Sequence, residues 1–253
     1  MVINDSRFAV MRAVDAELQC SYNGAKECAM KTLALIHTSL VFINVETMMR
    51  DIFEEVMPEV RRINIVDDSL LPDVMASGEI SAAVQERMNL YVQAAALSGA
   101  DAVLSLCSSL GPSLDAARKL VKIPVIKIDD AMTAQAARQA ERIGVLATVR
   151  TTLKPTVDLI FEKAADQKKQ LEIHQKLVDG AFQVLMSGDR DRHDALVLAA
   201  ARELSSEVDL LVLAQASMTR LAPRLQDETG RAVLSSPRLA IEYTRKVLYS
   251  EGK

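Results

Sequence analysis

Cys107 is the residue best suited to chemistry, because it stands between a short apolar run, 102–106, and two serines. The run is expected to be a buried strand, and Pro112 fits the start of a following helix, where its missing N–H costs nothing. A helix N-terminus would favour a thiolate and lower the pKa of the thiol. Free amides there, with Ser108 and Ser109, could bind a carboxylate. The ordinary alternative is a small cysteine packed at a strand end.

Three threonines form a second candidate cluster. Thr148, Thr151 and Thr152 stand between an expected strand, 143–147, and an expected helix, 153–165. Hydroxyls and free N–H groups at such a junction could cradle an anion. A threonine at the start of a helix is also commonly its N-cap. Both interpretations stay open.

His37 directly follows the first expected strand, 33–36, and Ser39 comes two residues later. Imidazole titrates near neutral pH, so His37 could act as an acid, a base or a hydrogen-bond donor, with a structural role as the alternative. Ser39 could add a hydroxyl to an anion site. Segment 35–39 contains no glycine, which argues against a glycine-rich phosphate loop of the dinucleotide-binding or P-loop kind.

Short apolar runs alternate with amphipathic helical stretches along the chain beyond Met30. This alternation predicts an α/β fold in which parallel sheets are covered by helices on both sides. Strands are expected near 33–36, 60–66, 102–106, 124–128, 143–147, 168–178, 210–214 and 232–235, and helices near 45–60, 80–98, 114–121, 131–142, 153–165, 193–205 and 239–248.

The second half repeats the order of the first. Cys107 follows Asp101 by six positions, and Gln215 follows Asp209 by six positions, with an apolar strand between them in each case. We interpret this as two copies of one α/β unit, with chance similarity of generic α/β sequence as the alternative. Ligands bind beyond the carboxyl ends of parallel strands, so the loops after these strands should line a cleft between two facing lobes.

Composition excludes several classes of protein. The 253 residues are 49% hydrophobic with a net charge of −4, which excludes intrinsic disorder. There is no long basic run and no tryptophan, which argues against a nucleic-acid partner. An odd set of three cysteines in so large a chain does not suggest a disulfide framework, and no Cys or His pair has a zinc-like spacing.

The sequence also sets expectations about location. No apolar run reaches the roughly 18 residues of a spanning helix, and the charged start has no secretory pattern, so we expect a cytoplasmic protein without membrane contact. Residues 1–29, which include Cys20 and Cys28, are expected to be an N-terminal extension, with an extra helix packed on the core as the alternative.

Three segments together resemble the aspartate/glutamate/hydantoin racemase superfamily. They are 101–109, 144–152 and 213–218, and the likeness extends from about Met30 to the C-terminus. It implies two Rossmann-like lobes with parallel four-stranded sheets, related by a pseudo-twofold axis, with a cleft between them. The resemblance further implies that residues 30–128 and 239–253 form the first lobe and 129–238 the second.

The resemblance also implies a chemistry. Such racemases use no metal and no organic cofactor, act on small carboxylates, and place one cysteine from each lobe beside the substrate α-carbon. Cys107 matches the first of these cysteines, but Gln215 stands where the second is expected. A glutamine amide can donate or accept a hydrogen bond but cannot shuttle a proton. Members are commonly oligomeric, which implies a homo-oligomer.

Our hypothesis from the sequence is a cofactor-independent isomerase that moves a proton at the carbon next to a carboxylate. The alternatives are a one-cysteine lyase or decarboxylase, and a small-acid-binding protein that has lost its chemistry. Cys107 is the expected base or acid, Gln215 the orienting amide and His37 the second proton carrier. The expected substrate-binding residues are Ser39, Ser108, Ser109, Thr148, Thr151, Thr152, Ala216 and Ser217.

Overall fold

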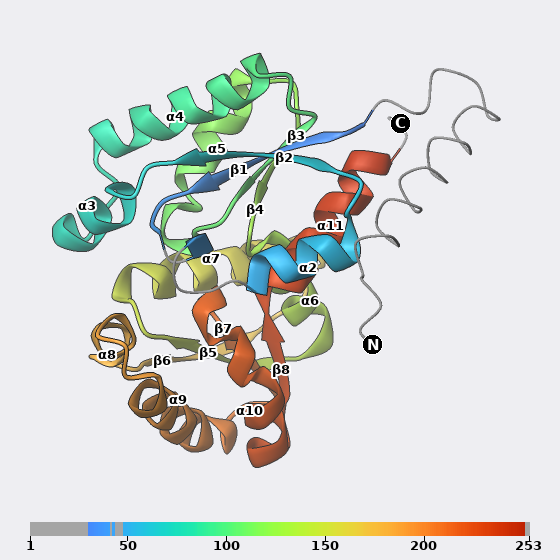
Figure 1. Cartoon of the computed structure of the whole chain (residues 1–253). Helices are drawn as coiled ribbons and strands as arrows, with labels where there is room; N and C mark the ends of the chain where they lie inside the picture. The colour runs from blue at the N-terminus through green and yellow to red at the C-terminus, as the bar shows by residue number, and fades with distance from the viewer. Residues whose placement is uncertain (1–29, 41, 44–47, 251–253) are drawn as a thin grey trace, which may run out of the picture.

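Two four-stranded parallel sheets form the framework of the protein. The structure is a computed structural model that describes residues 30–40, 42–43 and 48–250. The first sheet has the strand order β2-β1-β3-β4 and the second has the matching order β6-β5-β7-β8. In Figure 1 the lobes built on these sheets lie one above the other, with the first lobe at the top. The expected α/β fold with two parallel four-stranded sheets is confirmed.

Buried apolar residues define the strands of both sheets. The central strands carry nearly continuous buried runs, as parallel strands covered on both faces should. The outer strands β2 and β6 are only partly buried. The strands are β1 (Thr32–His37), β2 (Arg61–Val66), β3 (Ala102–Ser105), β4 (Val125–Lys127), β5 (Arg142–Ala147), β6 (Glu172–Leu177), β7 (Leu210–Leu213) and β8 (Ala232–Ser235).

The strand register supports the repeat expected from the sequence. Ile36 of β1 pairs with Ser105 of β3, and Leu146 of β5 pairs with Leu213 of β7. Each third strand is followed two residues later by the residue expected in the site, Cys107 in one lobe and Gln215 in the other. These two residues therefore occupy equivalent positions in the two lobes.

Asp101 and Asp209, the acidic residues of the repeat, make equivalent contacts in the two lobes. Asp101 accepts a hydrogen bond from the backbone N–H of Thr32 at 2.8 Å, at the start of β1. Asp209 pairs with Arg142 at 2.6 Å, at the start of β5. In each lobe the carboxylate before the third strand thus ties that strand to the beginning of the first.

Helices cover both faces of each sheet. On the first sheet α2 and α11 pack on one face, and α3, α4 and α5 on the other. On the second sheet α6 and α7 cover one face, and α8, α9 and α10 the other. The helices are α2 (Met48–Val56), α3 (Leu70–Ser77), α4 (Ala82–Leu97), α5 (Ser113–Ala117), α6 (Asp130–Gln139), α7 (Arg150–Asp166), α8 (Ala181–Met186), α9 (Arg190–Ser205), α10 (Ala222–Thr229) and α11 (Ser236–Tyr249), with short 3-10 turns η2 (Ser108–Leu110), η3 (Arg118–Leu120) and η4 (Ala216–Leu221).

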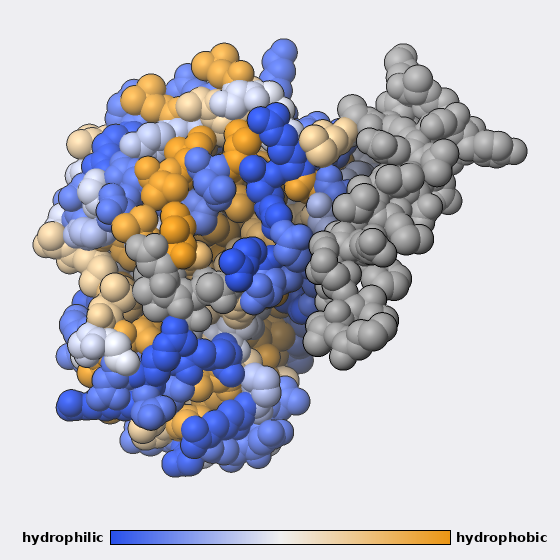
Figure 2. Space-filling view, in the orientation of Figure 1, coloured by the Kyte–Doolittle hydropathy of each residue, from blue (hydrophilic) through white to orange (hydrophobic). Residues whose placement is uncertain are grey.

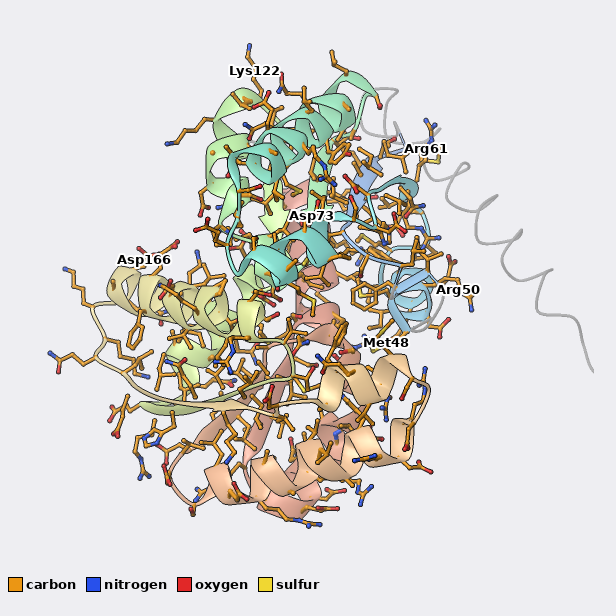
Figure 3. The ribbon with its side chains drawn as sticks, turned by 90° about the vertical axis from the view of Figure 1, so that its left-hand side faces the viewer. Met48, Arg50, Arg61, Asp73, Lys122 and Asp166 are labelled. Carbon is orange, nitrogen blue, oxygen red and sulfur yellow. The ribbon has the colours of Figure 1, made fainter. Side chains whose placement is uncertain are left out.

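The lobes meet through helices. In the first lobe's core, side chains of α11 pack with the first sheet, although α11 follows the last strand of the second. Across the boundary α7 packs against η2 and α3, and α6 packs against α11. Figure 3 shows α7, which ends at Asp166, running along the boundary below α3, which carries Asp73.

Hydrophilic residues dominate the surface of the second lobe in the view of Figure 2, whereas hydrophobic residues are more frequent over the first lobe. None of the helices in the described part of the chain is long and apolar enough to cross a membrane. The expected extension, residues 1–29, lies outside the described residues.

The sequence missed three short helices, α3, α8 and α10. Each has eight residues or fewer, which is too short for a helical repeat of apolar positions to stand out. The strand expected within 168–178 is β6, at Glu172–Leu177. The helix expected at 131–142 ends at Gln139, because β5 begins at Arg142. Helix α2 begins at Met48, and the first residues of the expected helix 45–60 lie outside the described part.

Gly144 in β5 lets α9 lie directly on the second sheet. A Cβ atom at this position would come within 2.8 Å of Leu204 Cδ2 and 2.9 Å of Leu211 Cδ2. Such distances are closer than carbon atoms can approach, so a side chain here would force the Leu204 and Leu211 side chains to shift. The glycine in segment 144–152 is therefore a packing requirement.

Gly144→Ala should lower the free energy of unfolding by about 1–3 kcal/mol, because it overpacks a tight contact. Urea unfolding measures the loss. The matched control is Leu204→Ala, which removes the side chain that the new Cβ would strike. The double variant should be more stable than the sum of the two single losses, since each change relieves the other. Simple additivity would show that the contact is not the cause.

Candidate active site

A small cavity lies where the carboxyl ends of the strands of both sheets face each other. Its volume is about 60 Å³, enough for a few atoms of a small ligand. Loops after β1, β3, β5 and β7 contribute to its walls. This is where parallel α/β sheets bind ligands, because helix N-termini and strand ends converge there.

Eight of the eleven expected site residues line this cavity. Three do not: His37, Thr148 and Thr151. The eight lining residues are Ser39, Cys107, Ser108, Ser109, Thr152, Gln215, Ala216 and Ser217. Residues far apart in sequence are thus brought into one site, with Cys107 from the first lobe and Gln215 from the second.

Cys107 sits at the turn from β3 into η2 and is partly exposed at the cavity wall. Burial of the thiol raises its pKa above the usual value of 9.0, although the Thr38 hydroxyl and the N–H groups of Leu110 and Ser109 act to lower it. The expected lowering by the helix end is therefore wrong. The turn is a short 3-10 helix, and its two N–H groups do not outweigh the loss of water around the sulfur.

Gln215 is fixed by its amide oxygen. Gln215 Oε1 accepts hydrogen bonds from the backbone N–H of Thr148 at 2.5 Å, the N–H of Val149 at 3.2 Å and the Thr148 hydroxyl at 3.1 Å. Backbone N–H groups can only donate, so the oxygen of the amide must face them. This leaves the NH2 group as the free end of the side chain.

The two lobes use their strand-end threonines in the same way. The hydroxyl of Thr148 donates to Gln215 Oε1, and the hydroxyl of Thr38 interacts with the thiol of Cys107. Thr148 therefore positions Gln215 and is not part of the cavity wall. Among the residues that the structure describes, no partner is found for the amide nitrogen of Gln215, so it can donate to a ligand.

Hydroxyl groups join the lobes beside the cavity. Ser109 belongs to the first lobe, and Thr151 and Thr152 belong to the second. Ser109 Oγ lies 3.1 Å from Thr151 Oγ1 and 2.9 Å from Thr152 Oγ1. The N-cap of α7 is Val149, which makes no side-chain capping bond. The threonines are therefore not N-caps; Thr151 serves the contact between the lobes, and Thr152 serves both this contact and the cavity wall.

His37 lies outside the cavity wall, at the end of β1. Its Nε2 atom is 2.9 Å from Asn64 Oδ1 on the neighbouring strand, and Nδ1 is buried without a partner in the described part of the chain. Burial lowers the pKa of His37, against the opposing effect of Asn64. The imidazole is packed against the sheet, and the lowered pKa favours its neutral form.

The loop after β2 is held by a polar cluster. Burial acts to raise the pKa of Asp67, but hydrogen bonds from Arg87, Tyr91 and Ser69 outweigh it and lower the value to about 2. Arg87 Nε lies 3.0 Å from the carboxylate, and the Tyr91 hydroxyl 2.7 Å. This cluster fixes the start of α3, which carries Leu71 to the cavity.

The sequence analysis missed the apolar part of the wall and one buried acid. Phe42, Leu71 and Phe182 line the cavity, and the last two belong to the short helices that the pattern did not reveal. Asp129, at the start of α6, is buried near Ser108. It stands in the loop after β4, a strand-end loop like those that were considered, so the same rule could have found it.

Cys107 is the only titratable side chain among the described residues that line the cavity. No group of three or more potential metal ligands occurs in the described part of the chain. The chemistry available there consists of one thiol, one amide NH2 group, several hydroxyls and an apolar wall.

The sequence matches the family model described as Asp/Glu/Hydantoin racemase over residues 43–244. The chain belongs to this family. The family resemblance expected from the segments around Cys107, Gly144 and Gln215 is therefore confirmed. A search of the curated proteins found no match.

Solved structures of two racemases and of a decarboxylase share the fold. Glutamate racemase isoform RacE1 from Bacillus anthracis is 18% identical with a TM-score of 0.68, covering 88% of this chain and 83% of that one. Allantoin racemase from Klebsiella pneumoniae is 18% identical with a TM-score of 0.62, covering 86% and 87%. Unliganded arylmalonate decarboxylase is 14% identical with a TM-score of 0.56, covering 88% and 95%.

Gln215→Ala should destabilise the protein by about 1–3 kcal/mol, because it removes the acceptor of two backbone N–H groups. Gln215→Glu keeps an oxygen acceptor at the start of a helix, where negative charge is favourable, and should retain most of the stability. Denaturant unfolding of both variants measures the difference. Equal losses for Ala and Glu would contradict this assignment of the amide oxygen.

Cys107 should react slowly with iodoacetamide at pH 7.5, because only the thiolate reacts and burial raises the pKa of the thiol. The rate should keep rising as the pH increases past 9. Mass spectrometry of the Cys107 peptide measures it, with the urea-unfolded chain as the matched control. Faster reaction in the folded protein than in urea at pH 7.5 would mean that the site activates the thiol.

Proposed function

We propose that the protein is a cofactor-independent enzyme that moves a proton at the carbon next to a carboxylate, with Cys107 as the proton carrier. The single observation that carries this proposal is the arrangement of the cavity, where one thiol is opposed by the amide of Gln215. The family supplies the reaction class, since racemases of this kind move a proton at such a carbon. The substrate we propose is a small amino, hydroxy or oxo acid or a hydantoin-like compound.

In the isomerase reaction, the Cys107 thiolate removes the proton from the carbon next to the carboxylate. The electron pair of the broken C–H bond moves into the carboxyl group and forms an enediolate, and the thiolate becomes a thiol. Hydroxyls of Ser108 and Ser217 and the NH2 group of Gln215 would stabilise the oxygens of this intermediate by hydrogen bonding. The thiol then delivers the proton on the same face. Return to the same carbon gives hydrogen exchange without net change, whereas delivery to a neighbouring atom of a conjugated intermediate gives the isomer. Either step restores the thiolate.

A site with a single proton carrier limits the stereochemical outcome of this reaction. Inverting a carbon centre needs a base on one side and an acid on the other. We therefore propose proton transfer on one face of the substrate, as in an isomerisation, and not the two-thiol racemisation of the family. The mechanism leaves out His37, which does not line the cavity and is held by Asn64.

A second candidate is decarboxylation, and the raised pKa of the Cys107 thiol favours it. A thiol that stays protonated at neutral pH can act directly as an acid. It can act as a base only after it has lost its proton. In this reaction the C–C bond to one carboxylate breaks, carbon dioxide leaves, and the electron pair forms the enediolate of the remaining carboxylate. Cys107 gives its proton to the carbon, and solvent restores the thiol.

Cys107→Ala should reduce turnover by at least about 1000-fold, because it removes the sole proton carrier of the proposed site. A panel of small hydroxy, oxo and amino acids, malonates and hydantoins is incubated in deuterated water and followed by NMR. Deuterium at the carbon next to the carboxylate indicates the isomerase, and release of carbon dioxide indicates the decarboxylase. Full activity in the alanine variant would contradict both.

The matched variant is Gln215→Cys, which places a second thiol at the equivalent position of the other lobe. It should add inversion of a chiral substrate to the exchange catalysed by the wild type. Chiral chromatography of the recovered substrate measures this gain. Exchange with inversion already present in the wild type would overturn the one-sided mechanism.

A further inference from the structure

Two apolar side chains reach the cavity from equivalent positions of the two lobes. Leu71 is the second residue of α3, and Phe182 is the second residue of α8. Each follows the last residue of its outer strand, β2 or β6, by five positions, and those last residues pair with the last residues of β1 and β5. In Figure 1 the helices α3 and α8 lie on the same side of the molecule, one in each lobe. The repeat thus brings an apolar side chain to the cavity twice.

The residue before each of these side chains fixes its helix to the core. Leu70 and Ala181 are fully buried, the first in the core of the first lobe and the second in that of the second lobe. The N–H of Leu71 donates to the carbonyl oxygen of Thr38 at 3.1 Å. The N–H of Ala181 donates to the carbonyl oxygen of Val178 at 3.2 Å. Both apolar side chains are therefore held at the wall by packing and backbone hydrogen bonds of the protein itself.

The strand order divides the cavity into a polar part and an apolar part. Leu71 and Phe182 are the only described wall residues that come from the segments after β2 and β6. The hydroxyls, the thiol of Cys107 and the amide of Gln215 all come from the segments after β1, β3, β5 and β7. Because β2 and β6 lie at the edges of the two sheets, the apolar pair lies on the side of these edges.

None of the described residues that line the cavity carries a charged side chain at neutral pH. The hydroxyls and the NH2 group of Gln215 can bind carboxylate oxygens. A charged group at the far end of the substrate, whether carboxylate or ammonium, would instead face Leu71 and Phe182. Burial of a charge without a partner is costly, whereas burial of a hydrocarbon group is favourable.

The charged cluster at the start of α3 does not serve the cavity. Arg87 binds Asp67 through Nε at 3.0 Å and Asp73 through Nη1 at 2.8 Å. None of these three residues lines the cavity. The guanidinium group is thus occupied by two carboxylates of its own lobe and does not provide a partner for a substrate anion.

We propose that Leu71 and Phe182 select a substrate whose carbon next to the carboxylate bears an uncharged apolar substituent, such as a short alkyl chain. The inference rests on the proposed function, because it takes the site and the bound carboxylate from it, and it narrows the substrate class. Acids such as aspartate and glutamate, whose substituents end in a second carboxylate, fall outside this class. The volume of about 60 Å³ keeps the substituent short.

Binding of saturated acids to the full chain tests this selection, with ligand-observed NMR titration as the measurement. Butyrate, succinate and 4-aminobutyrate have the same number of carbons, and their far ends carry a methyl group, a carboxylate and an ammonium group. Butyrate should bind at least roughly 10-fold more tightly than the other two, because their second charge has no partner in the wall. From acetate to butyrate, each added methylene should tighten binding roughly 2–4-fold.

Two results would overturn the proposal. One is binding of succinate or 4-aminobutyrate as tight as that of butyrate. The other is the lack of any gain in affinity from acetate to butyrate.

Variants of Phe182 test whether this residue makes the selection. Phe182→Ala should remove most of the gain from acetate to butyrate, and Phe182→Leu, which keeps an apolar side chain, should retain it. The matched control is Met186→Ala in the same helix, because Met186 is exposed and does not line the cavity. This control should leave all affinities unchanged. An unchanged series in Phe182→Ala would show that Phe182 does not select the substituent.

Failure of this inference can be told from failure of the proposed function. The titration measures binding and needs no turnover, so the order of affinities does not depend on whether Cys107 is catalytic. Full activity in Cys107→Ala would remove the proposed function and leave that order intact. Exchange that depends on Cys107, together with equal affinities for butyrate and succinate, would remove only this inference.

Discussion

The hydrogen bonds between Gln215 Oε1 and the backbone N–H groups of Thr148 and Val149 are the constraint on which the site depends. They turn the amide so that its NH2 group is the end left for a ligand, and they join the third strand of the second lobe to the start of α7. The cavity therefore pairs a proton carrier on one side with a fixed hydrogen-bond donor on the other. A second thiol at this position could not make the same bonds, because sulfur is a weak acceptor.

The fold contains two copies of one α/β unit. The copies differ at the residue after the third strand, which is Cys107 in the first lobe and Gln215 in the second. Both lobes place a strand-end threonine beside the residue after the third strand, Thr38 near Cys107 and Thr148 near Gln215. Ser109 then holds the lobes together through the threonines of α7. The same geometry that suits a symmetric pair of acids and bases here holds one acid and one amide, which favours chemistry on one face of a substrate.

The sequence was sufficient for the framework because buried parallel strands and their spacing leave a clear pattern. It placed both sheets, the repeat and most of the cavity wall, since strand ends in such sheets converge by rule. The sequence analysis failed for properties that depend on a balance between opposing interactions in the folded protein. The pKa of Cys107 depends on how far burial outweighs two N–H groups, and the role of Thr151 depends on which hydroxyl of the opposite lobe it meets. Neither Phe182 nor Leu71 could be found, because short helices leave no periodic signal.

The stereochemistry of proton delivery tests the central claim most directly. A prochiral substrate that turns over is converted in deuterated water, and the configuration of the labelled carbon is determined by chiral analysis. A single thiol facing a fixed amide predicts one labelled configuration, lost together with activity when Cys107 is replaced by alanine. Equal amounts of both configurations from the wild type would contradict the account, because they would require a second proton carrier on the opposite face.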